Sequence, residues 1–579
     1  MGSLDQDQIY DFIICGGGTS GCVIAGRLSE CSDVSILVIE AGQDSKNLEN
    51  VHMVGGSSQL FEKETDWNIT SEPRPAVNDR TVKLTRGKFL GGCSGCNATL
   101  CIRGSRQDYD DWGVEGWSGK EVFAYMRKAE RFHGKDWFDA CDSEHGTDGP
   151  LDVEPYDLAP ISKLLFESFV DKGLPLDDDL FTHGDTPHGC GHMLRSAHNG
   201  IRSTAAKFIT NKARARGDVK IMTETLVDKV FIERVDGELR ATGVRAVKAD
   251  GSIMDVRARK EVIVSGGAYC SPNILNRSGI GATEELGKFG IKTLVELPGV
   301  GKNLMDHLII FLIYETEQEG LTVDKELFHG DGLAKSYALW KEQKAGILAG
   351  FPVGCAAFAR LDERLSDSAV WNDAPREPGR DPMGLTPRQP NVEILSIQCY
   401  GGPTSYTDFP VGGQHTFCLV PMLFGPRSRG TVALRSADAK DVPVVDKNYL
   451  ADPLDLEVMA EACRFTNEIV MEGKGTRGVV KGWWPSNMTH HRYTTREDWI
   501  PFVRETGTTC FHPGGTCVMG KTDDPKTVVD AKLRVKGVKG LRVADCSIMP
   551  TLNGGHTQMP AYAIGEKAAD LVKEAWGLK

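Results

Sequence analysis

The segment from residue 10 to residue 42 constrains the fold more than any other part of the sequence. It begins with the apolar run YDFIICG at 10–16, continues with CVIAGRLSE at 22–30, which has helical periodicity, and ends with the apolar run VSILVIEAG at 34–42. Two apolar runs joined by a helix are typical of parallel strands that are buried on both faces. The segment therefore predicts a strand–helix–strand unit of a parallel α/β sheet.

Three glycines connect the first predicted strand to the helix. Gly16, Gly18 and Gly21 satisfy the pattern G-x-G-x-x-G, and Glu40 ends the second strand, 24 residues after Gly16. Such a turn lets backbone N–H groups and the helix N-terminus face a pyrophosphate, while the acidic residue accepts hydrogen bonds from ribose hydroxyls. The spacing predicts a dinucleotide site and disfavours NADP. NAD and FAD both fit the loop, and a glycine turn that binds nothing is the alternative.

Composition narrows the class of protein. At 579 residues and 63.2 kDa the chain exceeds one compact core, so we expect two large domains. The net charge of -13 disfavours nucleic acid as a partner. Because no run of about 18 apolar residues and no secretory signal is evident, we expect a soluble intracellular protein without a membrane span. The cytoplasm is the expected compartment, and the C-terminal GLK makes a peroxisome the alternative.

The cysteine content also favours an intracellular protein. The chain has 16 cysteines but no pair of C-x-x-C motifs and no HExxH motif. Without a secretory signal, this number fits reduced thiols better than a disulfide framework. We expect no metal site.

Five longer motifs narrow the choice between nucleotides. They are RGKFLGGCSGCNATLCIRGS at 86–105, EVIVSGGAYCSPNILNRSGIG at 261–281, LPGVGKNLMDH at 297–307, HPGGTCVMG at 512–520 and LRVADCSIMPTLNGGHTQMPAYAIGEKAADLV at 541–572. Together, from about residue 9 to the C-terminus, they resemble the glucose-methanol-choline (GMC) oxidoreductase family. The motifs are most similar to those of aryl-alcohol oxidase, choline dehydrogenase and formate oxidase-like members.

The resemblance implies an α/β fold with FAD as the cofactor. A Rossmann-like FAD-binding domain would be assembled from the discontinuous segments 1–155, 203–310 and 530–579. A substrate-binding domain with an antiparallel sheet would comprise 156–202 and 311–529, since 311–510 contains strand-like stretches such as HTFCLVPML.

The motif match also implies which residues contact FAD, chiefly through the backbone. They are Gly16, Gly18, Thr19, Ser20, Gly21, Glu40, Ala41, Arg86, Gly91, Gly92, Ser94, Cys96, Asn97, Ala98, Val227, Gly266, Ala544, Asp545, His556, Thr557 and Gln558.

Two histidines are the expected catalytic pair. Alcohol oxidation removes a hydroxyl proton and a carbon-bound hydride, so the site needs a base beside the oxygen and an electron sink, which FAD supplies. His512 occupies the family's catalytic position, and we assign it the role of the base. His556 would hydrogen-bond the substrate oxygen, although the pair can titrate as a unit. His307 belongs to a motif at the domain junction, and we interpret it as structural.

Three positions bear on the particular reaction. Cys96 stands where choline-oxidising members carry a histidine linked to the flavin, so a thioether to FAD through Cys96 is one hypothesis. Formate-oxidising members carry arginine where this chain has His556, which disfavours formate. Phe511 resembles the aromatic residue that packs on the substrate in aryl-alcohol-oxidising members, and it favours a primary alcohol with an aromatic or apolar body.

Other functions stay open. The electron acceptor is either molecular oxygen or a quinone-like carrier. The same fold also serves non-redox enzymes, namely hydroxynitrile lyases and a cyclase of secondary metabolism. A non-catalytic flavin-binding protein is a further alternative, but it would have no use for the two histidines.

Overall fold

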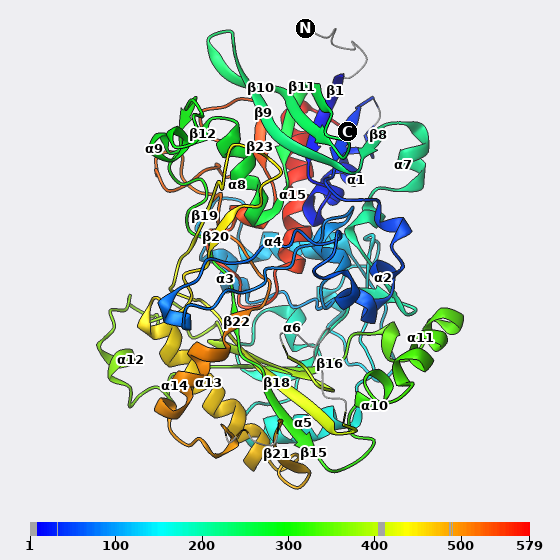
Figure 1. The fold of residues 1–579 in the computed structure, drawn as a ribbon, viewed down its shortest axis with the longest axis vertical. Coiled ribbons are helices and arrows are strands. Elements are labelled where there is room, and N and C mark those ends of the chain that lie inside the picture. The colour runs from blue at the N-terminus through cyan, green and yellow to red at the C-terminus, as the bar shows by residue number, and fades with distance from the viewer. Residues whose placement is uncertain (1–8, 32, 403–411, 486–487, 489) are drawn as a thin grey trace.

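Two large sheets organise the computed structural model, which describes residues 9–31, 33–402, 412–485, 488 and 490–579. Figure 1 shows the sheet that contains β1, β11 and β23 at one end of the molecule and the sheet that contains β15, β16 and β18 at the other. In the described part of the chain, every helix is too short or too polar to cross a membrane.

The first sheet has seven strands in the order β8-β2-β1-β11-β10-β9, with β23 paired to β11. Their bounds are β1 (Ile9–Cys15), β2 (Ile36–Ile39), β8 (Val219–Met222), β9 (Thr225–Val235), β10 (Glu238–Lys248), β11 (Ile253–Val264) and β23 (Leu541–Val543). Strands β8, β2, β1, β11 and β23 are parallel, whereas β9, β10 and β11 form an antiparallel meander. The apolar runs of the sequence are the buried central strands, as predicted.

Helices α1 (Thr19–Leu28) and α15 (Gln558–Trp576) pack against each other at this sheet, although they come from opposite ends of the chain. A glycine permits the close approach: a Cβ added at Gly565 of α15 would lie 2.7 Å from the Cβ of Val23 on α1. The packing of α15 places its N-terminal residues, which follow His556, beside the carboxyl ends of the parallel strands (Figure 1).

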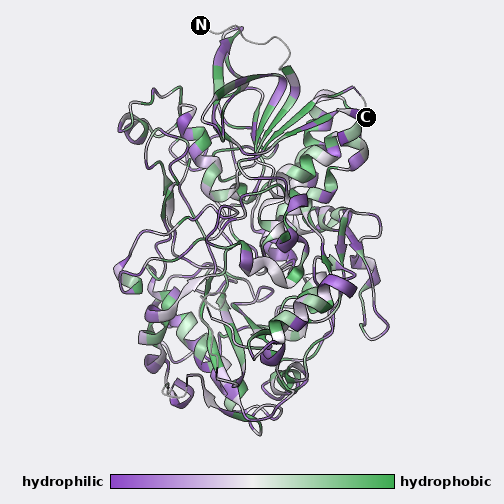
Figure 2. Ribbon diagram, turned by 45° about the vertical axis from the view of Figure 1, so that its right-hand side comes forward, coloured by the Kyte–Doolittle hydropathy of each residue, from purple (hydrophilic) through white to green (hydrophobic). Residues whose placement is uncertain are grey.

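The second sheet is antiparallel throughout, with the strand order β21-β15-β18-β17-β16-β5 and with β14 and β22 at its side. The bounds are β5 (Gly189–His192), β14 (Leu308–Ile309), β15 (Leu312–Thr316), β16 (Val353–Ala359), β17 (Val392–Ile397), β18 (His415–Leu423), β21 (Val480–Trp483) and β22 (Thr508–Thr509). Most residues of β17 and β18 are apolar and buried, and Figure 2 shows hydrophobic strands in the sheet at this end of the molecule. This sheet is the predicted antiparallel element.

Successive residues of β17 face opposite sides of this sheet. Ile394 belongs to the apolar core beneath helices α5 (Pro160–Asp171), α13 (Pro453–Glu472) and α14 (Arg496–Thr506), whereas Leu395 belongs to a separate apolar cluster. Leu395 and Ile397 line a cavity. A strand with apolar residues on both faces is expected when helices cover one face and another domain covers the other.

Short elements complete the fold. The other helices are α2 (Glu49–His52), α3 (Arg106–Asp110), α4 (Gly119–Ala129), α6 (Leu180–His183), α7 (Asn211–Arg216), α8 (Gly267–Arg277), α9 (Thr283–Gly287), α10 (Asp324–Leu327), α11 (Gly332–Gln343) and α12 (Ala369–Asp373). Two-stranded pairs are β3 (Glu130–Phe132) with β4 (Leu151–Val153), β6 (Ala197–His198) with β7 (Ile201–Arg202), β12 (Ile280–Gly281) with β13 (Val295–Glu296), and β19 (Thr431–Ala433) with β20 (Val444–Asp446). The domain boundaries expected from the sequence stay a prediction.

Candidate active site

A cavity of about 1380 Å³ lies between the two sheets. On one side it is bounded by residues that follow the parallel strands directly, such as Gly16 after β1, Glu40 after β2 and Ser265 after β11. Ligands of open parallel sheets bind at these carboxyl ends. The other side is formed by the face of the antiparallel sheet that carries Leu395 and Ile397.

The structure brings nearly all predicted site residues to this cavity. Those that line it are Gly16, Gly18, Thr19, Ser20, Glu40, Ala41, Arg86, Gly92, Ser94, Cys96, Asn97, Ala98, Val227, Gly266, Asp545, His556, Thr557 and Gln558, together with Phe511 and His512. Gly21, Gly91 and Ala544 do not line it. They lie just behind the wall, where Gly91 donates a hydrogen bond to the carbonyl of Gly17 at 2.7 Å and Ala544 donates to Val264 at 2.9 Å.

The glycine loop has the geometry that the sequence predicts. Gly16 has φ +107°, and a Cβ there would lie 2.5 Å from the carbonyl oxygen of Ser265. A Cβ at Gly21 would lie 2.0 Å from the carbonyl oxygen of Gly16. Gly18 precedes α1, and no side chain caps the N-terminus of this helix. The free N–H groups of α1 are therefore available to a phosphate.

Glu40 holds the loop from the neighbouring strand. Its Oε2 accepts a hydrogen bond from the N–H of Gly17 at 2.9 Å and its Oε1 accepts from Gly42 at 2.9 Å. Burial raises the pKa of Glu40, while these two N–H groups act in the opposite direction. The cavity continues past Glu40 to Val227, and at its other end it reaches His512. An elongated cavity with a phosphate loop and a terminal polar cluster fits FAD.

His512 is anchored from two sides. Its backbone N–H donates to Oδ1 of Asp306 at 2.7 Å, and its Nδ1 lies 3.0 Å from Nδ1 of His307. Burial lowers the pKa of His512 well below its usual value, and repulsion from the neighbouring basic side chains, among them Arg86 and Lys447, lowers it further. His512 is therefore neutral at physiological pH.

Asp306 is the centre of the polar cluster behind His512. Its Oδ2 accepts hydrogen bonds from Lys447 at 2.6 Å, from Tyr449 at 2.5 Å and from Thr509 at 2.6 Å. Lys447 is fully surrounded by protein and pairs with this carboxylate. Burial acts to raise the pKa of Asp306, but the charge of Lys447 holds it below its usual value. The cluster fixes the backbone of His512 without using its imidazole.

His556 has a different partner from His512. Its Nε2 lies 3.1 Å from Oε1 of Glu393 on β17, which is fully buried. The other carboxylate oxygen of Glu393 has no hydrogen-bond partner among the described residues. The rings of His512 and His556 meet edge to face with centroids 4.6 Å apart. The two imidazoles thus converge at the cavity, one beside a histidine and one beside a carboxylate.

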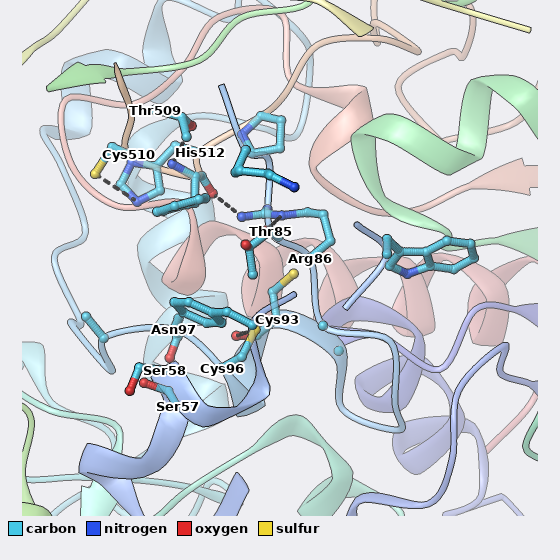
Figure 3. Close-up of a pocket in the computed structure, with 18 of the residues that line it drawn as sticks. Ser57, Ser58, Thr85, Arg86, Cys93, Cys96, Asn97, Thr509, Cys510 and His512 are labelled. Carbon is cyan, nitrogen blue, oxygen red and sulfur yellow. Dashed lines mark hydrogen bonds between the residues drawn. The ribbon is translucent and has the colours of Figure 1, made fainter. Parts of the chain in front are cut away.

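The cavity wall opposite the ring of His512 contains Arg86 and the segment 92–97 (Figure 3). The Nη2 of Arg86 donates to the carbonyl of Phe511 at 2.7 Å, which connects this wall to the residue before His512 (Figure 3). Phe511 has φ +60° and is 38% exposed, so its ring is available to a ligand in the cavity. Cys96 is buried, and a thioether from Cys96 to FAD stays a prediction.

Two contacts of the predicted catalytic pair were not predicted from the sequence. The contact of Glu393 with His556 was not predicted because the two residues are 163 positions apart in the sequence. The feature that could have revealed Glu393 is a single acidic residue within the mainly apolar strand sequence VEILSI. His307 was interpreted as structural, but its ring contacts His512 directly. The sequence also contains one C-x-x-C pair, Cys93 and Cys96, inside the motif at 86–105.

The comparisons with known proteins agree with this geometry. Two family models, both described as GMC oxidoreductase, match residues 10–309 and 426–565. The glucose dehydrogenase [FAD, quinone] of Drosophila pseudoobscura pseudoobscura is 32% identical over 99% of this chain and 88% of its own. The oxygen-dependent choline dehydrogenase of Brucella anthropi is 33% identical over 97% of this chain and 95% of its own. A crystal structure of formate oxidase superposes with a TM-score of 0.90, 29% identity and 98% coverage of both chains.

The fold and the cavity define a flavin-dependent oxidoreductase, and the matches identify which kind. The chain belongs to the GMC oxidoreductase family. It is an FAD-dependent enzyme that oxidises alcohols. The predicted family, fold class and cofactor are confirmed.

Proposed function

We propose that this enzyme oxidises a primary alcohol with an aromatic or apolar body to the aldehyde, with His512 as the base and His556 as the group that holds the substrate oxygen. The observation that carries the proposal is the convergence of these two imidazoles, 4.6 Å between centroids, at a cavity whose substrate side is apolar. FAD, when bound, supplies the acceptor for the hydride that leaves the substrate carbon.

The surroundings of His512 suit a base. A neutral imidazole has one protonated and one unprotonated nitrogen. For Nε2 to accept the hydroxyl proton, Nδ1 must donate its hydrogen to Nδ1 of His307, the contact measured at 3.0 Å. Because the pKa of His512 lies well below its usual value, the neutral form persists into mildly acidic solution. A positioned base of this kind contributes about 10²- to 10⁴-fold in rate.

The surroundings of His556 suit the opposite task. Glu393 is placed to form an ion pair with a protonated His556 through Nε2. In that state Nδ1 also carries a hydrogen, which it can donate to the substrate oxygen as negative charge develops. The repulsion between the two imidazoles acts against protonation of His512. The two histidines therefore support each other in different protonation states.

The substrate side of the cavity favours an apolar molecule. Side chains of Phe311, Val353, Leu395 and Val420 line it, and Phe511 stands next to His512. Apolar walls stabilise the body of a substrate in proportion to the apolar area removed from water, and they leave its polar groups without partners. A sugar or a charged alcohol would lose hydrogen bonds there. The electron acceptor under this proposal is molecular oxygen or a quinone-like carrier.

A panel of alcohols mixed anaerobically with the holoenzyme tests the proposal. Aromatic and long-chain primary alcohols should bleach the visible flavin absorbance faster than sugars or choline do. The His512→Ala variant should keep its flavin and reduce it at least about 10²-fold more slowly. His188→Ala, a histidine outside the cavity, serves as the matched control. Repeating the reaction in air with peroxide detection distinguishes oxygen from a quinone-like acceptor.

Two results would contradict the assignment. A flavin that stays oxidised with every alcohol of a broad panel would favour the alternative, a lyase or cyclase on the same fold. Unchanged reduction in His512→Ala would remove His512 from the mechanism.

A further inference from the structure

Two cysteines lie three residues apart in the cavity wall, and the proposed mechanism uses neither. Cys93 and Cys96 form the C-x-x-C sequence Cys93-Ser94-Gly95-Cys96; the 3₁₀ helix Gly92–Gly95 contains Cys93, and Cys96 follows directly as its C-terminal cap. The N–H of Cys96 donates to the carbonyl of Cys93 at 3.3 Å, which closes one turn. In such a turn residues i and i+3 eclipse each other about 6 Å apart along the axis. A disulfide requires a similar Cα separation, roughly 4.4 to 6.8 Å.

The two thiols have opposite electrostatic surroundings. A hydrogen bond from Cys96 lowers the pKa of Cys93 to about 6, and the positive charge of Arg86 acts in the same direction. The same hydrogen bond and burial raise the pKa of Cys96 well above its usual value. A thiolate in contact with a thiol is the reactive state of C-x-x-C pairs. The other cysteines that line the cavity, Cys15, Cys270, Cys399, Cys510 and Cys546, have a pKa raised by burial.

The position of the pair connects it to the cofactor. Figure 3 shows Cys93 and Cys96 on the wall opposite His512, next to Arg86 and Asn97. Both cysteines line the same cavity as the catalytic histidines, and both are free thiols in this structure. FAD bound between the glycine loop and His512 would lie along this wall, since all of these residues line one cavity.

We propose that Cys93 and Cys96 form a redox-active dithiol that exchanges two electrons with the bound flavin. In the oxidising direction the Cys93 thiolate gives up its negative charge, the Cys96 thiol gives up its proton, and an S–S bond forms between them. The two electrons and the proton pass to the flavin, so the atoms and charges balance. The enzyme then stores four electrons rather than two. This inference requires flavin binding but does not depend on the identity of the alcohol.

The proposal has a direct consequence for the resting enzyme. An acceptor that reoxidises the flavin draws electrons from the dithiol as well, so the aerobic holoenzyme should contain the disulfide. Electrons that arrive from an alcohol can return from the flavin to the disulfide and regenerate the two thiols. Such a pair would keep a second two-electron equivalent next to the flavin between turnovers.

Differential alkylation of the holoenzyme tests the bond. The aerobic protein is unfolded anaerobically in N-ethylmaleimide, then reduced and treated with an isotopically heavy form of the reagent. Tryptic cleavage after Lys88 and Arg103 places both cysteines in one peptide, residues 89–103. We expect Cys93 and Cys96 to carry the heavy label and Cys101, in the same peptide, to carry the light one. Light label on all three would overturn the proposal. Flavin attached to Cys93 or Cys96 would also overturn it, because a thioether sulfur cannot form a disulfide.

An anaerobic dithionite titration tests the electron exchange. The holoenzyme should consume four electrons per flavin, and Cys93→Ser and Cys96→Ser should each consume two. Cys270→Ser removes another cavity-lining cysteine and should still consume four, which makes it the matched control. Two electrons in the unmodified enzyme, or four in the Cys93 and Cys96 variants, would overturn the proposal. If either variant fails to retain flavin, the unmodified enzyme's electron count and labelling pattern decide the question. Failure of the alcohol panel would leave both measurements unaffected.

Discussion

The two walls of the cavity are built in different ways. On the nucleotide side the chain presents backbone: Gly16 and Gly18 carry no side chains, and a Cβ at Gly16 would collide with a carbonyl oxygen. On the substrate side the antiparallel sheet presents side chains such as Leu395 and Val420. A backbone surface tolerates few residue types, whereas an apolar surface accepts many combinations of similar volume. The first wall therefore specifies one ligand class, whereas the second can be built from several combinations of apolar side chains.

The strongest test of this contrast adds a single methyl group to the wall that is formed by backbone atoms. Gly16→Ala adds a Cβ 2.5 Å from the carbonyl oxygen of Ser265, at φ +107°. Strain of this kind costs about 1–3 kcal/mol, and the contact adds a similar amount. We expect flavin affinity to fall at least about 100-fold, as measured by titrating the apoprotein with FAD. The control is Gly287→Ala, where a Cβ meets no atom within 4 Å. Full flavin content in Gly16→Ala would show that the loop can move.

The second test concerns Glu393 and His556, which lie where the two walls meet. Glu393→Gln keeps the shape of the side chain but removes the negative charge that faces His556. A hydrogen bond to a charged group is worth about 1.5–3 kcal/mol, so we expect flavin reduction to slow by roughly 10- to 100-fold. The loss should appear in kcat more than in KM, since the charge on the substrate oxygen develops only in the transition state. An unchanged kcat would exclude this role for Glu393.

The contrast between the walls also explains what the sequence could reveal. The glycine loop and Glu40 are readable because a pyrophosphate requires those residue types at that spacing. The family motifs then predicted the fold, FAD and the histidine pair. Glu393 reaches His556 only through the register of β17 in the second sheet, and no local pattern encodes a contact over 163 positions. The same holds for the apolar wall, whose members come from β14, β15, β16, β17 and β18 and share no motif.

A smaller effect is expected on the side-chain wall. Val420 of β18 lines the cavity, and Val420→Thr replaces a methyl group with a hydroxyl at nearly the same volume. A hydroxyl without a partner in an apolar wall costs about 1–3 kcal/mol when a ligand covers it. We expect the preference in kcat/KM for an apolar over a polar alcohol to fall by at least about 3-fold, with flavin content unchanged. Leu456→Met, in the core beneath the sheet, is the control for altered packing. A preference that stays the same would place the substrate elsewhere.

The smallest predicted effect is a dependence of stability on pH at the junction of the two walls. Burial lowers the pKa of His307 from 6.5 to about 3, so the folded protein holds this imidazole neutral while the unfolded chain protonates it below pH 6.5. The unfolded state then binds more protons, and stability falls as the pH drops from 6.5 towards 3. His307→Gln lacks this group. Its stability deficit at pH 8 measures lost packing, and below pH 6 the deficit should shrink by roughly 1 kcal/mol per pH unit. Guanidinium unfolding of both proteins at pH 8, 6 and 5 measures the difference in stability, and a constant difference would mean that His307 binds its proton over the same pH range in the folded protein as in the unfolded chain.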